Sequence, residues 1–318
     1  MRFGTFVPQG WKSDLDGIPT ELQWDRVLEI AGLIERSGYD SLWVYDHFHT
    51  HPVVKHESTF EAWTLMAALA VATDRVRLGQ MCTCALYRPP SLLAKLASNI
   101  DVISGGRLDV GIGAGWSKGE FRAYGYPFPS AGQRLAQLDE AVQVLLAMWS
   151  QDEAGFSGVH YQVDGAINLP RAFQEPHPPL WIAGGGEKKT LRIVAKYADF
   201  SNFGDSIESF RHKSAVLADH CEDVGRDYEE IGRTIHLMSV VARNDSELND
   251  KLEIAARRRS TTPEQFSDEH LAVTVGEAVE KLGQYKEAGC VEAILYFYDI
   301  GEGDSLELVA SEVIPQLR

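Results

Sequence analysis

An acid and three histidines follow a short apolar run in the segment Ser41–Thr50. Asp46 and His47 come directly after the run, and His49 and His51 follow at alternate positions. Apolar β-formers that stop at polar groups are typical of a buried strand that delivers those groups to its carboxyl end. Imidazole titrates near neutral pH, so His47 suits proton transfer, and Asp46 is placed to orient the ring.

A metal site is the alternative interpretation of the same residues. On an extended chain the side chains of His47, His49 and His51 point the same way, and imidazole is the commonest metal ligand. Metal-dependent barrel hydrolases carry such a pattern, but they need further ligands at later strand ends. The predicted strands that end at Ala183 and Asn202 offer no histidine, so no metal is predicted, and a polar loop explains His49 and His51 as well.

Two glycine-rich segments follow other predicted strands. Gly111–Trp116 has the spacing that lets backbone approach a flat ligand, and Trp116 adds an aromatic wall or packs in the core. Gly184–Gly186 precedes a predicted helix, and helix N-termini bind phosphate. A tight turn alone also explains these glycines. Further pocket residues are expected at strand ends: Gln9, Trp11, Thr83, Tyr87 and Asn202.

Strands and helices alternate along the chain, which predicts an α/β fold of the (β/α)8 TIM barrel class. The expected strands are Arg2–Val7, Ser41–Tyr45, Arg75–Cys84, Leu108–Ile112, Leu180–Ala183, Asp199–Asn202, Thr234–Ala242 and Ala293–Tyr298. The expected helices are Glu21–Ser37, Thr59–Thr73, Ser91–Ile103, Ala131–Trp149, Lys188–Tyr197, Ile207–Val224, Val275–Ala288 and Leu306–Leu317.

We expect one domain, residues 1–318, with insertions after the fourth and seventh strands at about 154–178 and 244–274. The first insertion is predicted to hold a β-hairpin over Phe156–Leu169 that turns at Asp164-Gly165, because Asp-Gly is a strong hairpin signal. The second insertion, Asn244–His270, is polar and charged and contains Arg257-Arg258-Arg259.

Charge and composition exclude some partners. The 318 residues carry a formal charge of −16, which disfavours nucleic acid and anionic membranes as partners. No apolar run reaches a membrane span, and the N-terminus lacks signal-peptide features, so a cytoplasmic location is expected. The four cysteines, Cys82, Cys84, Cys221 and Cys290, have no zinc-type spacing and are expected to be reduced.

Several segments together resemble the luciferase-like superfamily of flavin- and deazaflavin-dependent oxidoreductases, most closely its coenzyme F420 branch. The resemblance lies in Phe3–Gln9, Gly38–His47, Arg75–Gly79, Tyr87–Pro90, Asp101–Trp116 and Pro179–Gly186. It implies a TIM barrel with an insertion after strand seven and a deazaflavin or flavin at the barrel mouth. It also implies a small-molecule substrate and a possible homodimer.

The resemblance further implies roles for residues of this chain. Asp46 and His47 would lie against the deazaflavin, the Met81–Cys82 peptide would be cis behind its ring, and Gly184–Gly186 would hold its phosphate. Related sugar-phosphate dehydrogenases have a glutamate where this chain has Trp116, which argues against that activity. The implied cofactor-binding residues are Asp46, Met81, Cys82, Thr83, Gly113, Ala114, Gly115, Trp116, Gly184, Gly185, Gly186, Lys188 and Asn202.

The sequence therefore predicts an F420-dependent oxidoreductase in which His47 is the acid/base and Gln9, Trp11, His49 and Tyr87 line the substrate pocket. An FMN-dependent two-component monooxygenase shares most of these features and stays open, as do the metal hydrolase and a barrel that only binds a flavin. Lys55, Arg88 and Lys188 favour F420 weakly, because they are able to receive its acidic tail.

Overall fold

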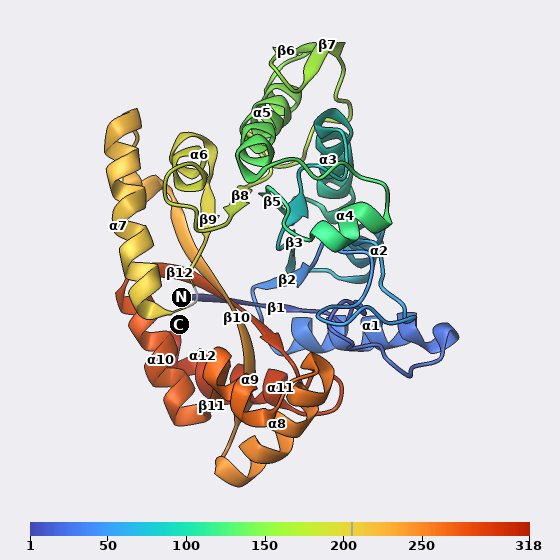
Figure 1. Cartoon of the computed structure of the whole chain (residues 1–318), viewed down its shortest axis with the longest axis vertical. Coiled ribbons are helices and arrows are strands. Elements are labelled where there is room, and N and C mark those ends of the chain that lie inside the picture. Colours follow the sequence, from blue (N-terminus) through green and yellow to red (C-terminus); the bar gives the residue numbers. More distant parts are fainter. Residues whose placement is uncertain (205) are drawn as a thin grey trace. The chain divides into compact units, whose positions relative to one another are not determined.

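The computed structural model describes residues 1–204 and 206–318 and alternates strands with helices (Figure 1). The strands are β1 (Arg2–Phe6), β2 (Ser41–Val44), β3 (Arg77–Gln80), β4 (Thr83–Cys84), β5 (Leu108–Gly113), β6 (Ala154–Ser157), β7 (Gln162–Ala166), β8 (Leu180–Ala183), β9 (Phe200–Asn202), β10 (Gly232–Ala242), β11 (Leu271–Thr274) and β12 (Cys290–Phe297).

The α-helices are α1 (Thr20–Arg36), α2 (Ala62–Ala72), α3 (Pro90–Ser104), α4 (Lys118–Ala123), α5 (Ala131–Ser150), α6 (Thr190–Tyr197), α7 (Ile207–Val224), α8 (Asp245–Arg259), α9 (Pro263–Glu269), α10 (Val275–Glu287), α11 (Ser305–Leu308) and α12 (Ile314–Leu317). A 3₁₀ turn spans Tyr228–Glu230, and a π-helical turn spans Val309–Val313 inside the closing helix.

All eight predicted barrel strands are present, as β1, β2, β3, β5, β8, β9, β10 and β12, and the (β/α)8 fold class is confirmed. Chain contacts group into two compact units, each described below by itself. The single domain with two insertions stays a prediction.

The first unit comprises Met1–Glu61, Phe203–Ser214 and Gly232–Arg318. Its strands run parallel in the order β11-β10-β12-β1-β2. Aromatic rings fill its core: Phe6 stacks on Tyr45 with ring centroids 4.2 Å apart and meets Tyr296 edge-on at 5.8 Å. Such pairs add to the free energy gained from burying apolar area.

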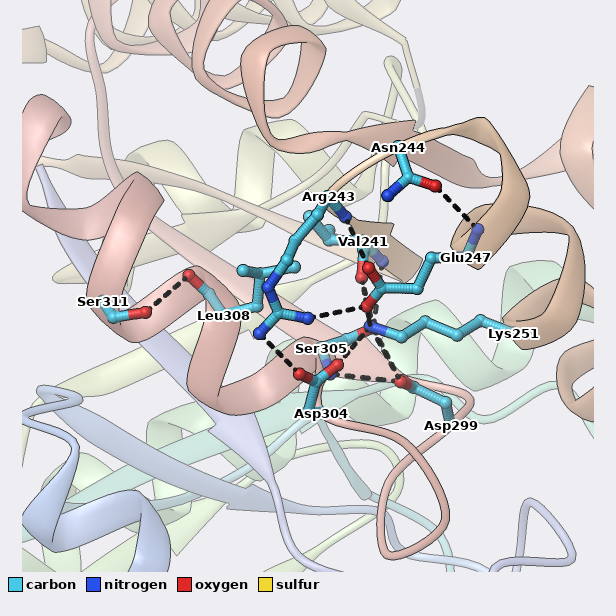
Figure 2. Close-up of polar contacts among 10 residues, drawn as sticks. All are labelled: Val241, Arg243, Asn244, Glu247, Lys251, Asp299, Asp304, Ser305, Leu308 and Ser311. Carbon is cyan, nitrogen blue, oxygen red and sulfur yellow. Dashed lines mark hydrogen bonds and ion pairs between the residues drawn. The ribbon is translucent and has the colours of Figure 1, made fainter.

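A polar network holds the carboxyl ends of β10 and β12 to helix α8 in this unit (Figure 2). Lys251 of α8 donates to the carbonyl oxygen of Val241 at 2.8 Å and pairs with Asp304 at 2.5 Å. Ser305 donates to the carboxylate of Asp299 at 2.7 Å and accepts from the Val241 amide at 3.0 Å. A buried ammonium with several oxygen partners avoids the cost of an unpaired charge.

The second unit comprises Ala62–Asn202 and Ala215–Ile231, with parallel strands in the order β3-β5-β8-β9 and β4 beside β5. Arg107, in the turn before β5, clamps the end of helix α2. Its guanidinium donates to the carbonyl oxygens of Ala70 at 2.7 Å, Thr73 at 2.8 Å and Val76 at 3.0 Å. The arginine therefore satisfies a carbonyl group that the end of α2 leaves open and two more in the segment between α2 and β3.

The β6–β7 hairpin is attached to helix α5 through Glu140. The Glu140 carboxylate accepts from the backbone amides of Val159, His160 and Tyr161 at 2.9, 2.7 and 3.0 Å. Burial opposes ionisation of this carboxyl, but the three N–H donors prevail and lower the pKa of Glu140 below its ordinary value.

The structure corrects several details of the sequence-based prediction. The hairpin turns at Gly158–Tyr161, where the Gly158 amide donates to the Tyr161 carbonyl, and the predicted turn at Asp164-Gly165 is wrong because both residues lie in β7. The third strand is interrupted at Met81 and Cys82. The segment from Asn244 to His270 is mostly helical, as α8 and α9, and the short helix α4 was not predicted.

Other boundaries shift by a few residues. Helix α2 begins at Ala62 instead of Thr59, and α6 begins at Thr190 instead of Lys188. None of the described helices has the length and apolar character needed to cross a bilayer.

Candidate active site

His47 lies in an aromatic stack at the carboxyl end of β2. Its ring is parallel to the Trp11 indole, with centroids 4.0 Å apart and an interplanar angle of 6°. His51 also stacks on Trp11 at 5.5 Å, and its amide donates to the Trp11 carbonyl oxygen at 2.8 Å. His47 is half-buried, and Asp46 beside it is buried. The stack holds the imidazole in one orientation, which proton transfer requires.

Gln9 fastens the loop after β1 to the end of β2. Its side-chain amide donates to the carbonyl oxygens of Tyr45 and Phe60, both at 2.7 Å, and accepts from the Tyr45 amide at 2.8 Å. Gln9 therefore positions Trp11 and His47 through the backbone. Gly10 permits this close fit, because its φ is +99° and an added Cβ would lie 1.8 Å from the Ser58 carbonyl oxygen.

Asp14 holds the other side of this loop. Its buried carboxylate accepts from the amides of Gln9 at 3.1 Å and Gly10 at 2.5 Å and from the Tyr296 hydroxyl at 2.7 Å. Burial raises the pKa of Asp14, and these hydrogen bonds act in the opposite direction. The residues Gln9, Trp11, Asp46 and His47 are thus brought together in the first unit. His49 lies half-buried in the loop beyond them.

The second unit brings together the glycines of β5 and the segment from Gln80 to Cys84. The Met81–Cys82 peptide bond is cis, as predicted. A Cβ on Gly111 would lie 1.9 Å from the Gln80 carbonyl oxygen, and one on Gly113 would lie 2.6 Å from the Cys82 sulfur. Gly115 has a φ of +73° and faces the sulfur of Cys84 in the same way. Packing within the protein therefore accounts for the glycine spacing.

Two buried polar side chains flank this bulge without a partner. Both atoms of the Gln80 amide and the Thr83 hydroxyl make no hydrogen bond within the described part of the chain. A buried polar group without a partner costs free energy, and such groups are uncommon in native proteins. Both side chains are 0% exposed, so a ligand with a polar edge would satisfy them only if their surroundings opened. Sequence reasoning missed Gln80, because Arg75–Cys84 was interpreted as one continuous strand.

The remaining predicted residues of the second unit have different surroundings. Trp116 is 55% exposed, so it is not a core residue. Tyr87 is buried, and its hydroxyl donates to Glu120 of α4 at 3.0 Å. The Gly184 amide donates to the Asn202 carbonyl oxygen at 3.0 Å, which joins the ends of β8 and β9. Helix α6 begins without a side-chain cap, and Lys188 is exposed beside it.

The structure also shows the state of the cysteines and the arrangement of the candidate metal ligands. All four cysteines are free thiols, as predicted. Among residues 1–204 and 206–318, no group of three or more His, Cys, Asp or Glu side chains is placed to hold a metal ion. The alternation of His47, His49 and His51 therefore does not produce a ligand cluster in the described chain.

A family model described as luciferase-like monooxygenase matches residues 1–293. The chain belongs to this family. It is accordingly an oxidoreductase. The F420-dependent glucose-6-phosphate dehydrogenase of Amycolatopsis mediterranei (strain U-32) is 25% identical over 323 residues, which cover 92% of this chain and 94% of the relative.

Two further relatives represent different chemistries. The FMNH(2)-dependent dimethylsulfone monooxygenase of Pseudomonas putida is 28% identical over 236 residues, covering 69% of this chain and 63% of the relative. The solved structure of an F420-dependent secondary alcohol dehydrogenase in complex with an F420-acetone adduct has a TM-score of 0.83 at 22% identity, covering 100% of this chain and 99% of the other. This likeness establishes the shared fold.

Proposed function

We propose that this protein is an F420-dependent oxidoreductase that transfers a hydride between the deazaflavin and a small organic substrate. Relatives with F420-dependent names match nearly the whole chain. The observation in this chain that carries the proposal is the pair of unpartnered polar side chains, Gln80 and Thr83, beside the Met81–Cys82 bulge. The pyrimidine edge of a deazaflavin offers both an N–H donor and carbonyl acceptors, so it fits them.

The residues proposed to hold the cofactor come from several strand ends. Asp46, Thr83 and Asn202 are buried polar residues at these ends, and the uncapped start of α6 next to Gly184–Gly186 suits a phosphate. The other proposed contacts are Met81, Cys82, Gly113, Ala114, Gly115, Trp116 and Lys188. When bound, the cofactor would supply the hydride acceptor or donor.

His47 is proposed to move the proton that accompanies the hydride. The Trp11 stack restricts its ring, and half-burial leaves part of the ring accessible. Gln9 keeps the loop in place, and Trp11, His49 and Tyr87 are the proposed pocket residues of the substrate side. General acid–base catalysis of this kind contributes about 10²–10⁴-fold to the rate.

FMN is the second candidate cofactor. The Pseudomonas putida relative uses FMNH(2), and the flavin ring has the same pyrimidine edge as the deazaflavin. The rings differ at one atom, nitrogen N5 in flavin and carbon C5 in F420, and a flavin-dependent member would react with oxygen. Lys55, Arg88 and Lys188 are proposed to receive the acidic tail of F420, although Lys55 already pairs with Asp16 at 2.6 Å.

Absorbance titrations with F420 and FMN, run side by side, test the proposal. We expect F420 to bind at least about tenfold more tightly than FMN, which corresponds to a difference in binding free energy of about 1.4 kcal/mol. Gln80→Leu should weaken F420 binding by about tenfold or more and raise the melting temperature of the protein alone, because it removes an unpartnered amide. The exposed Gln316→Leu is the matched control and should change neither quantity. Equal affinity of wild type and Gln80→Leu for F420 would contradict the proposed site.

A further inference from the structure

Lys12 is a buried cation without an acidic partner. It is 1% exposed, and its ammonium lies 3.8 Å from the centroid of the Trp11 ring and 4.0 Å from the Met238 sulfur. It forms no ion pair with a carboxylate in the part of the chain that the structure describes. Aromatic faces attract a cation, but they replace little of the hydration that a buried ammonium loses.

Arg259 is a second cation in the same surroundings. It ends helix α8, is half-buried and acts on the pKa of Tyr298, whose hydroxyl contacts Met238. Its neighbours Arg257 and Arg258 both pair with Glu302, whereas Arg259 has no ion pair with any described carboxylate. Lys251 holds α8 to the strand ends (Figure 2), so the position of Arg259 is set by the fold.

The titratable groups near these two cations supply little negative charge. Asp14 and Glu269 are nearby acids: the Asp14 carboxylate is already taken by two backbone amides and the Tyr296 hydroxyl, and Glu269 acts on His270. Burial, Lys12 and His270 lower the pKa of His236 to about 3, and burial together with Arg259 lowers that of His270. The remaining neighbours are Arg258 and the neutral phenols Tyr45, Tyr296 and Tyr298. Lys12 and Arg259 therefore lie without a carboxylate partner of their own in a chain of charge −16.

A cavity of about 620 Å³ in the first unit adjoins this group through Met238, but neither Lys12 nor Arg259 lines it. Met238, His236 and His270 lie on its wall, and Met238 also contacts Lys12 and the Tyr298 hydroxyl. Carboxylates lie on the wall of this cavity, so an anion gains free energy only if it passes Met238 and reaches the buried cations. These carboxylates are Glu208, Asp268, Glu269, Glu277 and Glu280.

We propose that Lys12 and Arg259 form a subsite that binds the anionic oxygen group of the substrate, so that the substrates of this enzyme are organic acids. The assignment of this anion to the substrate rests on the proposed function. Lys12 contacts Trp11, which stacks on His47, so the indole links the proposed anion site to the proposed proton-transfer group. A guanidinium fork and an ammonium are the usual partners of carboxylate and phosphate.

Anion binding should be coupled to proton uptake. Burial and the charge of Arg259 lower the pKa of Lys12 well below its ordinary value, and a bound anion would act in the opposite direction. A bound anion favours the ammonium and draws a proton onto it. The affinity for an anion is therefore expected to fall as the pH rises, whereas that for a neutral analogue should not change.

Matched aromatic ligands test the subsite without knowledge of the natural substrate. Calorimetric titration at constant ionic strength compares benzoate with its neutral isostere benzamide, and phenyl phosphate separates a carboxylate site from a phosphate site. Lys12→Met and Arg259→Met each remove one charge, and the exposed Lys118→Met is the control. We expect benzoate to bind wild type and Lys118→Met equally and each of the other variants at least about tenfold more weakly.

The outcomes separate this inference from the proposed function. The subsite is refuted if benzamide binds as tightly as benzoate does. It is also refuted if the Lys12→Met and Arg259→Met variants bind benzoate as tightly as wild type does. Tighter binding of phenyl phosphate than of benzoate keeps the subsite and assigns it to phosphate esters. An F420 titration of the same samples reports on the cofactor alone, so failure there with intact benzoate binding refutes the cofactor proposal and leaves the anion site standing.

Discussion

The two groups of candidate residues are built in different ways. In the first unit, the side chains of Trp11 and His47 stack on each other, and Gln9 positions them indirectly through hydrogen bonds to the backbone. In the second unit, Gly111 and Gly113 are pressed against the backbone and sulfur of the Gln80–Cys84 segment, and no side chain at these positions fits. The comparison teaches that substitution of His47 should change chemistry, whereas side chains added at Gly111 or Gly113 should change folding.

Gly111→Ala should have the largest effect. The added methyl would lie 1.9 Å from a backbone carbonyl oxygen, which no rotamer change relieves. We expect the free energy of unfolding to fall by more than about 3 kcal/mol, measured by urea denaturation. Gly119→Ala in α4 is the control, since nothing lies within 4 Å of its added Cβ, and it should stabilise by about 0.5–1 kcal/mol. Similar stabilities of the two variants would refute the contrast.

His47→Gln tests the other side of the comparison. We expect turnover with F420 to fall about 100-fold or more, because the proton-transfer group is lost. Binding of F420 and the melting temperature should stay close to wild type, since the ring contributes a stacking contact and not a core. A loss of stability comparable with that of Gly111→Ala would show that His47 is a structural residue.

Arg107→Lys sharpens the comparison within the second unit. The arginine satisfies three carbonyl groups at once, one in the last turn of α2 and two in the segment that follows it, and a lysine is unable to reach all of them. The expected cost is about 2 kcal/mol of unfolding free energy, because buried carbonyl groups lose their donors. Cofactor affinity per folded molecule should be unchanged. Selective loss of affinity at wild-type stability would contradict the structural role.

Glu140→Gln should have the smallest effect on the whole protein. The pKa of Glu140 is lowered in the fold, so its contribution is present at pH values above its ordinary pKa and is lost as the pH falls through the lowered value. Amide hydrogen exchange of Val159, His160 and Tyr161 should accelerate several-fold in the variant at pH 7. The difference from wild type should shrink at acidic pH, while exchange in the barrel strands stays the same.

The sequence predicted regular elements well and their exceptions poorly. The apolar run Ser41–Val44 and the alternation of strands and helices depend on local patterns, and both agree with the structure. The hairpin turn depends on Glu140, which contacts Val159–Tyr161 from about twenty residues away, so no local signal marks it. Asp164-Gly165 has a local preference for a hairpin turn, but tertiary contacts outweigh this preference and place the turn elsewhere.

The candidate site divides in the same way. The histidine at the end of β2 was found from its position after an apolar run, and the glycines from their spacing. Gln80 and Lys12 were missed because their significance lies in what surrounds them: one is a buried amide and the other a buried amine, and neither has the usual partner. Burial and pairing depend on residues distant in sequence, which composition and periodicity do not report.

The attachment of the β6–β7 hairpin has a practical consequence. Its tip is exposed and is tied to α5 by three hydrogen bonds to one carboxylate, and its two strands pair only with each other among the described elements. A cysteine at position 159 for a fluorophore, or a short peptide tag spliced into the tip, would give the molecule a handle for imaging or immobilisation while the barrel strands keep their native partners.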